Sequence, residues 1–142
     1  MIAVRRAGAG DAGAIRLLNI QLGYDYPEDK TAEKLEIISK RPTDAIFVAE
    51  CDGKVAGYIH AADYDLIYSE PFKNILGLVV DEKFRGRGAG CALLAAVEKW
   101  AADTGAAGVR LNSNVKREEA HKFYLACGYI NEKQHKNFVK MF

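Results

Sequence analysis

The sequence predicts an α/β protein that forms a single domain over residues 1–142, and three observations lead to this class. Segments of strand-like composition alternate along the chain with segments whose apolar residues recur at helical spacing. A chain of 142 residues is long enough to bury one sizeable core. No internal repeat, low-complexity stretch or obvious linker interrupts it.

The first third of the chain predicts one strand followed by two helices. Ile2–Arg6 is the first predicted strand. Asp11 is placed to cap a helix with an apolar stripe, which Gly23 ends. Thr31 is placed to cap the second helix.

The rest of the chain predicts further strands and two more helices. Asp52-Gly53 is a strong two-residue turn signal, so the apolar segments on either side should form a hairpin. The predicted strands are Ala45–Cys51, Lys54–Ala61, Asn74–Val80, Val109–Asn112, and an antiparallel pair made by the chain from Tyr129 onward and by Phe138–Phe142. The predicted helices end at Thr104-Gly105 and, for the one that begins at about Arg117, at Gly128.

Composition excludes several classes of partner. A net charge of +1 and a pI near 7.7 predict no general binding to nucleic acid or to anionic membranes. No apolar run approaches a membrane span, and the N-terminus lacks a signal-peptide core, so we expect a cytoplasmic protein. The three cysteines show no C-x-x-C pairing and the three histidines no ligand spacing, so we expect reduced thiols and no metal site.

The stretch that follows Asn74–Val80 is the most informative one. A short polar bend leads into Arg85, Gly86, Arg87, Gly88, Ala89, Gly90 and Cys91, and an amphipathic helix starts there. Glycines let the backbone approach a ligand, helix-terminal N–H groups attract anions, and arginine binds phosphate through two donors. This order predicts a phosphate site. The spacing fits neither the dinucleotide motif G-x-G-x-x-G nor a Walker A loop, and a glycine-rich helix cap with solvated arginines is the alternative.

Two motifs together resemble the GNAT superfamily of N-acetyltransferases. Arg85-x-x-Gly88-x-Gly90 is similar to the family's acetyl-CoA pyrophosphate loop. Downstream, Ala120, Tyr124 and Gly128-Tyr129 are similar to its second signature, an alanine followed four residues later by tyrosine and then by a Gly-aromatic pair. The resemblance covers at least Asn74–Tyr129, and the order of the N-terminal elements agrees with it.

The resemblance implies an acyl-CoA N-acyltransferase fold: a mixed, mostly antiparallel sheet of six to seven strands, with about four helices on both faces and a splay beside the central strand. It implies acetyl-CoA as the acetyl donor, an amine as the acceptor and direct attack without a covalent enzyme intermediate; family members often form homodimers. The residues implied to bind the donor are Leu78, Val79 and Val80, the loop Arg85–Cys91, and Asn114 and Arg117. Arg117 departs from the family, which often has asparagine there.

The resemblance also implies a general acid. Tyr124 would return a proton to the departing CoA thiolate, although its helical face, shared with Ala120 and Cys127, equally suits a buried core tyrosine. The base that deprotonates the amine varies within the family. Glu70 is the leading candidate, and Asp65, Asp63 and His60 are alternatives.

Two acidic, tyrosine-rich segments bear on the acceptor. Residues 24–29 and 63–70 hold four of the seven tyrosines and six acidic residues, and in GNAT folds both connections border the acceptor cleft. Aromatic rings and carboxylates favour a cationic amine. The predicted acceptor-binding residues are Tyr24, Asp25, Tyr26, Asp65 and Tyr68. The alternatives are a protein or peptide acceptor, a CoA-binding domain without turnover, and loops that are acidic only for solubility.

Overall fold

Five strands form one sheet in the structure, a computed structural model that describes residues 1–142. The strands are β1 (Ile2–Arg6), β2 (Asp44–Cys51), β3 (Lys54–Tyr64), β4 (Phe72–Val80) and β5 (Gly108–Leu111). The α-helices are α1 (Ala12–Gln21), α2 (Glu28–Ser39), α3 (Ala89–Asp103) and α4 (Glu118–Ala126), and two 3-10 turns are η1 (Ala9–Asp11) and η2 (Glu82–Phe84). The chain divides into two compact units, Met1–Leu111 and Asn112–Phe142, and each is described by itself.

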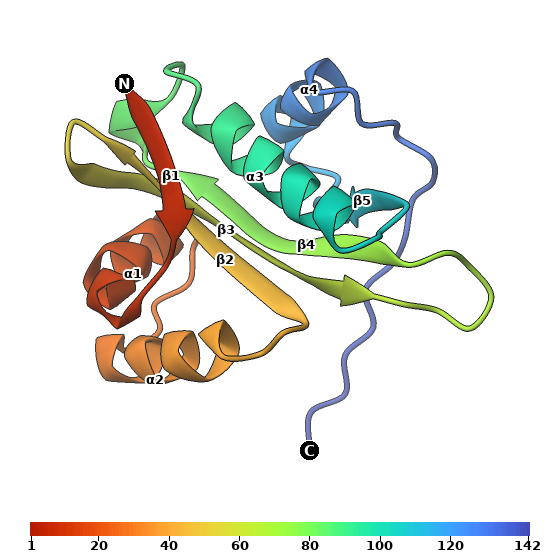
Figure 1. The fold of residues 1–142 in the computed structure, drawn as a ribbon, viewed down its shortest axis with the longest axis horizontal. Helices are drawn as coiled ribbons and strands as arrows, with labels where there is room; N and C mark the ends of the chain where they lie inside the picture. Colours follow the sequence, from red (N-terminus) through yellow and green to blue (C-terminus); the bar gives the residue numbers. More distant parts are fainter. The chain divides into compact units, whose positions relative to one another are not determined.

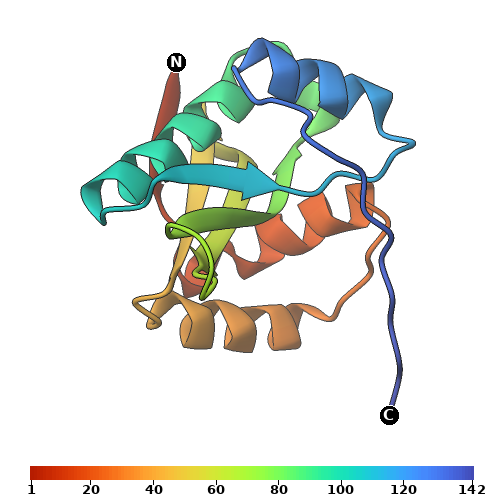
Figure 2. The same ribbon diagram turned by 90° about the vertical axis from the view of Figure 1, so that its right-hand side faces the viewer.

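The sheet of the first unit is mixed and mostly antiparallel. Its strand order is β1-β2-β3-β4-β5, and only β4 and β5 run parallel, joined by α3. Helices α1 and α2 cover one face of the sheet, and α3 covers the other (Figures 1 and 2). The predicted architecture is therefore confirmed. None of the helices is long and apolar enough to cross a bilayer.

The period-2 alternation of the strands builds a core on each face of the sheet. Ile46 and Val48 of β2 pack with Ile15 of α1 and Leu35 of α2 on the first face. On the second, α3 contacts β2, β3 and β4 with an apolar stripe that is completely buried at Leu93 and Val97. Burial on both faces explains why the central strands are more apolar than β1.

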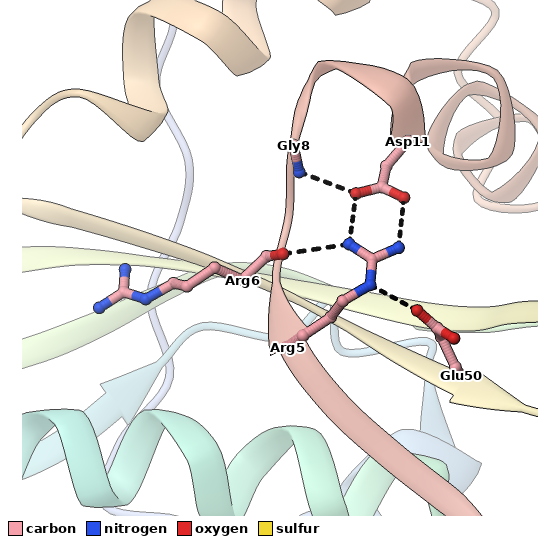
Figure 3. Close-up of polar contacts among 5 residues, drawn as sticks. All are labelled: Arg5, Arg6, Gly8, Asp11 and Glu50. Atoms are coloured by element: carbon pink, nitrogen blue, oxygen red, sulfur yellow. Dashed lines mark hydrogen bonds and ion pairs between the residues drawn. The ribbon is translucent and has the colours of Figure 1, made fainter.

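The structure corrects two predicted helix caps. Thr31 lies inside α2, which begins after Pro27, and the Thr31 hydroxyl donates to the Pro27 carbonyl at 2.9 Å. Asp11 stands at the start of α1 but does not cap that helix. Its carboxylate instead accepts the Gly8 N–H at 2.8 Å and a two-pronged ion pair from Arg5 at 2.8 and 2.9 Å (Figure 3).

The Asp11 network ties β1 to η1 and to β2. Arg5 also pairs with Glu50 of β2, so a single guanidinium holds two carboxylates (Figure 3). The hydrogen bonds from Arg5 lower the pKa of Asp11 despite its burial. The folded chain therefore binds the Asp11 proton less readily than the unfolded chain does. The stability that Asp11 contributes is present above about pH 4 and lost as the pH falls below it.

Replacing Asp11 with asparagine should lower the free energy of unfolding at pH 7 by about 1–2 kcal/mol, because it leaves the Arg5 fork half-paired. The difference from the wild type should shrink as the pH falls below about 4 and through the lowered pKa of folded Asp11, because the wild-type carboxyl then becomes neutral too. Urea unfolding at several pH values measures this. Asp103→Asn is the control, since Asp103 is exposed and pairs only with Lys99 within α3; its effect should stay under about 0.5 kcal/mol. Equal effects would contradict the assigned role of Asp11.

The C-terminal segment differs from the prediction. Residues 127–142 form no strand, so the sheet has five strands in place of six to seven, and the predicted pair at Tyr129 and Phe138–Phe142 is absent. A strand is stable only when its backbone groups pair with a neighbour. The seven residues from Asn131 are all polar, and they separate the apolar ends. The side chains of Phe138 and Phe142 are exposed.

Candidate active site

β4 has a free edge at its C-terminal half. It pairs with β5 only through Phe72–Ile75, and its register with β3 slips beside Leu76, which is the extra residue of a β-bulge. Bulges bend and twist a strand, so β4 leaves β5 at that point. The splay that the family resemblance implied is therefore a consequence of this pairing.

The backbone at this edge has a defined orientation. Asp81 N–H donates to Ala56 of β3, and a side chain on Gly57 would meet the Val79 carbonyl oxygen, so Val79 also turns its polar groups toward β3. Because neighbouring residues of a strand alternate, Leu78 and Val80 direct theirs to the free edge. An extended ligand can hydrogen-bond to Leu78 and Val80 as an additional strand would.

The glycine loop leads from this edge into α3. Asp81 caps η2 by accepting the Lys83 N–H at 3.0 Å, and the chain then passes through Gly86 and Gly88, whose φ angles are 80° and 90°. That backbone region is open to glycine and strained for other residues. The bonds within α3 start with Ala92 N–H donating to Gly88. The N–H groups of the first helical turn therefore point out of its N-terminal end, as an anion site requires.

The two arginines of the loop differ in their surroundings. Arg87 lies over the Phe84 ring at 5.4 Å, and its guanidinium is 3.9 Å from Asp52 in the β2–β3 turn. Arg85 is exposed and forms no ion pair within the chain, so its full charge is available to a ligand. Sequence reasoning alone did not separate them.

Tyr124 lies in α4, in the second unit. Its side chain is half-buried and packs edge-on against Phe123 and Tyr129, with ring centroids 5.4 and 5.9 Å away. Burial raises the pKa of Tyr124, and the charge of Arg117 opposes that rise without cancelling it. The phenol therefore stays protonated at neutral pH, which is the state a general acid needs.

Asn114 and Arg117 shape the turn that opens α4. The Asn114 side-chain oxygen accepts the Lys116 N–H at 2.9 Å, and its carbonyl accepts from the Arg117 N–H and from His121. Both oxygens of Asn114 are thus occupied by the turn and the helix that follows it. The Arg117 side chain is exposed and precedes the helix.

The predicted acceptor residues belong to two separate places of the first unit. Tyr26 lines a pocket of about 150 Å³ beneath α1 and α2, while Asp65 lines one of about 250 Å³ beside Lys73. Asp25 pairs with Arg16 at 2.9 Å. Tyr24 and Tyr68 are exposed. The two segments share neither pocket, and their meeting across an acceptor cleft stays a prediction.

Glu70, the leading candidate for the base, is exposed in the loop before β4. Phe72, where β4 begins, lies six residues before Leu78, or roughly 20 Å at about 3.3 Å per residue. Glu70 lies beyond Phe72, so the loop does not bring it to the free edge of β4.

A different polar group faces α1 and α2 close to that edge. Tyr58 and His60 of β3 line the smaller pocket together with Asn19 of α1. The Tyr58 hydroxyl donates to the Asn19 side chain, and His60 Nε2 is 2.8 Å from an Asp44 carboxylate oxygen. Sequence reasoning considered His60 and missed the other three. The signal was the spacing of Tyr58 and His60, which places both on one face of a strand.

Comparison with known proteins identifies the family. The model of the acetyltransferase (GNAT) family matches residues 13–129. The chain therefore belongs to the GNAT acetyltransferases, and it is an N-acetyltransferase with acetyl-CoA as its cosubstrate.

Individual relatives act on different acceptors. The chain is 32% identical to an aminoglycoside N(6')-acetyltransferase of Stenotrophomonas maltophilia, over 89% of this chain and 84% of that protein. It is 37% identical to an aminoalkylphosphonate N-acetyltransferase of Salmonella typhimurium. That similarity covers 63% of this chain and 57% of the relative.

Solved structures share the fold. The structure of the aminoglycoside N-acetyltransferase AAC(6')-Iy in complex with CoA superposes with a TM-score of 0.88 at 24% identity. The superposition covers 99% of this chain and 95% of the AAC(6')-Iy chain. A glucosamine-6-phosphate N-acetyltransferase from Arabidopsis thaliana has a TM-score of 0.84 at 22% identity and covers 98% of both. One fold thus serves several acceptors, and the fold alone does not name the acceptor of this chain.

Proposed function

We propose that this protein, acting as a single domain, transfers the acetyl group of acetyl-CoA to a primary amine of a small cationic molecule by direct attack of the amine on the thioester. The observation that carries the proposal is the free edge of β4 that runs straight into the glycine loop of α3. This edge offers a strand-like partner to the pantetheine arm, and the loop offers N–H groups to the pyrophosphate.

The donor residues then have separate tasks. Leu78 and Val80 bind the pantetheine arm through their backbone groups, and a backbone N–H near Val80 polarises the thioester carbonyl. The loop from Gly86 to Cys91 holds the pyrophosphate, and Arg85 adds a charge that no carboxylate of the chain neutralises. Held in this way, the thioester meets the amine at a high effective concentration.

Two proton transfers remain. Acetyl-CoA supplies a thioester, and a thiolate leaves when the amine attacks it. A phenol near pKa 10 protonates a thiolate near 8.5 at a cost of roughly 2 kcal/mol, and the raised pKa of Tyr124 adds to this cost. The transfer remains feasible within one hydrogen bond, so Tyr124 is the proposed acid. An alkyl amine resembling lysine must first lose a proton, at a cost of roughly 4.6 kcal/mol at pH 7.

A screen of amines tests the proposed function. Wild-type protein is incubated with acetyl-CoA and, separately, with neamine, 1,4-diaminobutane, n-butylamine, amino acids and short peptides, and release of the free CoA thiol is followed. We expect turnover with the small polyamines. Turnover only with peptides would replace the small acceptor with a peptide. Binding of acetyl-CoA without any turnover would indicate a CoA-binding domain.

The charge of the acceptor is tested by neutralising Asp25 and Asp65 together as asparagines. If both carboxylates attract the acceptor, KM for 1,4-diaminobutane should rise about three- to tenfold and KM for n-butylamine should change little, because each exposed pair contributes under about 1 kcal/mol. The difference should shrink as salt rises, since screening acts within roughly 10 Å at 0.1 M.

A matched charge control accompanies this double variant. Glu36→Gln with Asp103→Asn removes the same charge from two exposed helical pairs. An equal rise in KM for both variants would show a general field effect. An unchanged KM in the Asp25 and Asp65 variant would exclude these loops from acceptor binding.

A further inference from the structure

β3 presents two polar side chains on the face that α1 and α2 cover. Tyr58 and His60 are two residues apart, so both point to that face. A second residue holds each of them: Asn19 accepts from the Tyr58 hydroxyl, and Asp44 pairs with His60. Only a fifth of the His60 side chain is exposed, at 19%, and it borders the pocket of about 150 Å³. The arrangement resembles a base and its orienting carboxylate.

This row of side chains lies on β3, beside the half of β4 whose opposite edge is free. His60 pairs with Gly77 in the β3–β4 register, and Tyr58 pairs with Val79. The Tyr58 hydroxyl lies beside Gly77, since a Cβ at that position would be 3.7 Å from it. Opposite residues of antiparallel strands are about 4.5–5.5 Å apart at Cα. The backbone of His60 thus lies one residue pair away from the pair that contains Leu78. Glu70, by contrast, precedes the N-terminal end of β4.

The His60–Asp44 pair has one orientation that satisfies its hydrogen bonds. Thr43 donates its hydroxyl to the second Asp44 oxygen at 2.7 Å. Burial acts to raise the pKa of Asp44, and the hydrogen bonds from His60 and Thr43 lower it by more. An ionised Asp44 can only accept a hydrogen bond, so His60 Nε2 carries the hydrogen that it donates to Asp44. In the neutral imidazole the free lone pair is then on Nδ1.

We propose that His60, oriented by Asp44, accepts the proton that the acceptor amine must lose before it attacks; this rests on the proposed function. One ammonium N–H bond breaks, and the proton moves to His60 Nδ1, directly or through one water. The freed nitrogen pair forms the bond to the thioester carbonyl carbon, and the C–S bond breaks with its electron pair left on sulfur. The sulfur takes up one proton, and the product nitrogen loses its second proton. His60 then returns its proton to solvent. The nitrogen has lost two protons and the sulfur has gained one, so one proton is released overall.

The charges around His60 suit this cycle. Asp44 is placed to stabilise the imidazolium that forms. The cationic side chains nearby are Lys34 of α2, which also lines the pocket, and Arg41, whose charge acts on Asp44. The remaining titratable neighbours are the phenols of Tyr58 and Tyr26. Burial raises the pKa of Tyr58, so it remains a neutral hydrogen-bonding group beside the amine.

The test compares pH profiles of kcat/KM, with the acceptor from the screen that the wild type acetylates. His60→Gln keeps an N–H that can reach Asp44 but has no basic nitrogen. We expect kcat/KM to fall about 100-fold at pH 7. The deficit should shrink to within about threefold near pH 10, where much of an alkyl amine is already unprotonated. Asp44→Asn should show a smaller deficit of the same pH dependence, because His60 then loses its fixed tautomer.

Three further measurements make the outcome decisive. His135→Gln, in the exposed C-terminal segment, is the matched histidine control and should behave as wild type. An equal loss at every pH in His60→Gln, or no loss, would overturn the proposal. If Glu70→Gln showed a pH-dependent loss of kcat/KM and His60→Gln kept the wild-type kcat/KM, Glu70 would be the base. A wild type that binds acetyl-CoA and acetylates no amine would instead overturn the proposed function, so the two failures are distinguishable.

Discussion

Replacing Gly88 with valine should abolish the stabilisation that acetyl-CoA gives to the folded protein. A ligand that binds only the folded state at 100 times its Kd stabilises it by about 2.7 kcal/mol, roughly 10 °C in Tm for a chain of this size. Gly88 has a φ of 90°, and a Cβ there would meet no atom of the chain within 4 Å. A valine side chain would therefore project into the space that the pyrophosphate needs, and Kd should rise at least about 100-fold.

A second glycine provides the control for backbone strain. Gly105 ends α3 with a φ of 83°, and a Cβ there also meets nothing within 4 Å. Gly105→Val should cost similar stability, about 1–2 kcal/mol, and retain the full shift with acetyl-CoA. Calorimetric titration and thermal melts measure both effects. A normal shift in Gly88→Val would place the pyrophosphate elsewhere.

The arginines extend this test. Arg85→Ala should weaken acetyl-CoA binding more than Arg87→Ala does, because the Arg87 charge is already directed to the β2–β3 turn. The loss should be larger at low salt, where charges are less screened. Equal losses for the two variants would contradict the distinction drawn from their contacts.

Replacing Tyr124 with phenylalanine should lower kcat by about 100-fold or more while the Kd for acetyl-CoA changes little. The substitution keeps the ring and its edge-on contacts with Phe123 and Tyr129 and removes only the proton donor. Steady-state kinetics with the acceptor from the screen measure kcat, and a thermal melt checks folding. Nearly wild-type turnover would leave Tyr124 as a packing residue.

The pH dependence separates an acid from a packing residue at Tyr124. Because burial raises its pKa above the usual value near 10, the phenol should remain a donor across the neutral range. On the basic side of its pH profile, the wild type should lose activity only at strongly basic pH, as the phenol ionises, and Tyr124→Phe should lack that decline. A decline of the same midpoint in both proteins would assign it to another group.

Local patterns in the sequence determined most of the secondary structure. Asp52-Gly53 forms the predicted turn, with φ angles of 53° and 77°, and Gly23, Gly105 and Gly128 follow helices with positive φ, as predicted. These features depend on residues a few positions apart, so a sequence displays them directly. The motif around Arg85 and Gly88 likewise indicated the family, because its residues are contiguous.

The sequence-based predictions were wrong where residues far apart in the sequence decide the pairing of a group. Asp11 has the sequence signature of a helix cap, but Arg5 and the Gly8 N–H engage its carboxylate instead. Phe138–Phe142 has the composition of a strand, and no neighbouring strand pairs with it. Propensity describes what a segment can form, and pairing decides whether it does.

What the sequence by itself determined is therefore the fold class, the family and the place of the glycine loop between β4 and α3. Only the tertiary structure decided which backbone edge is free, which arginine is unpaired, and which side chains accompany His60. Tyr58, Asn19 and Asp44 come from three separate elements and have no common motif. They meet because β2 and β3 pair in one register and α1 packs on the same face, and that register depends on the burial of whole strands.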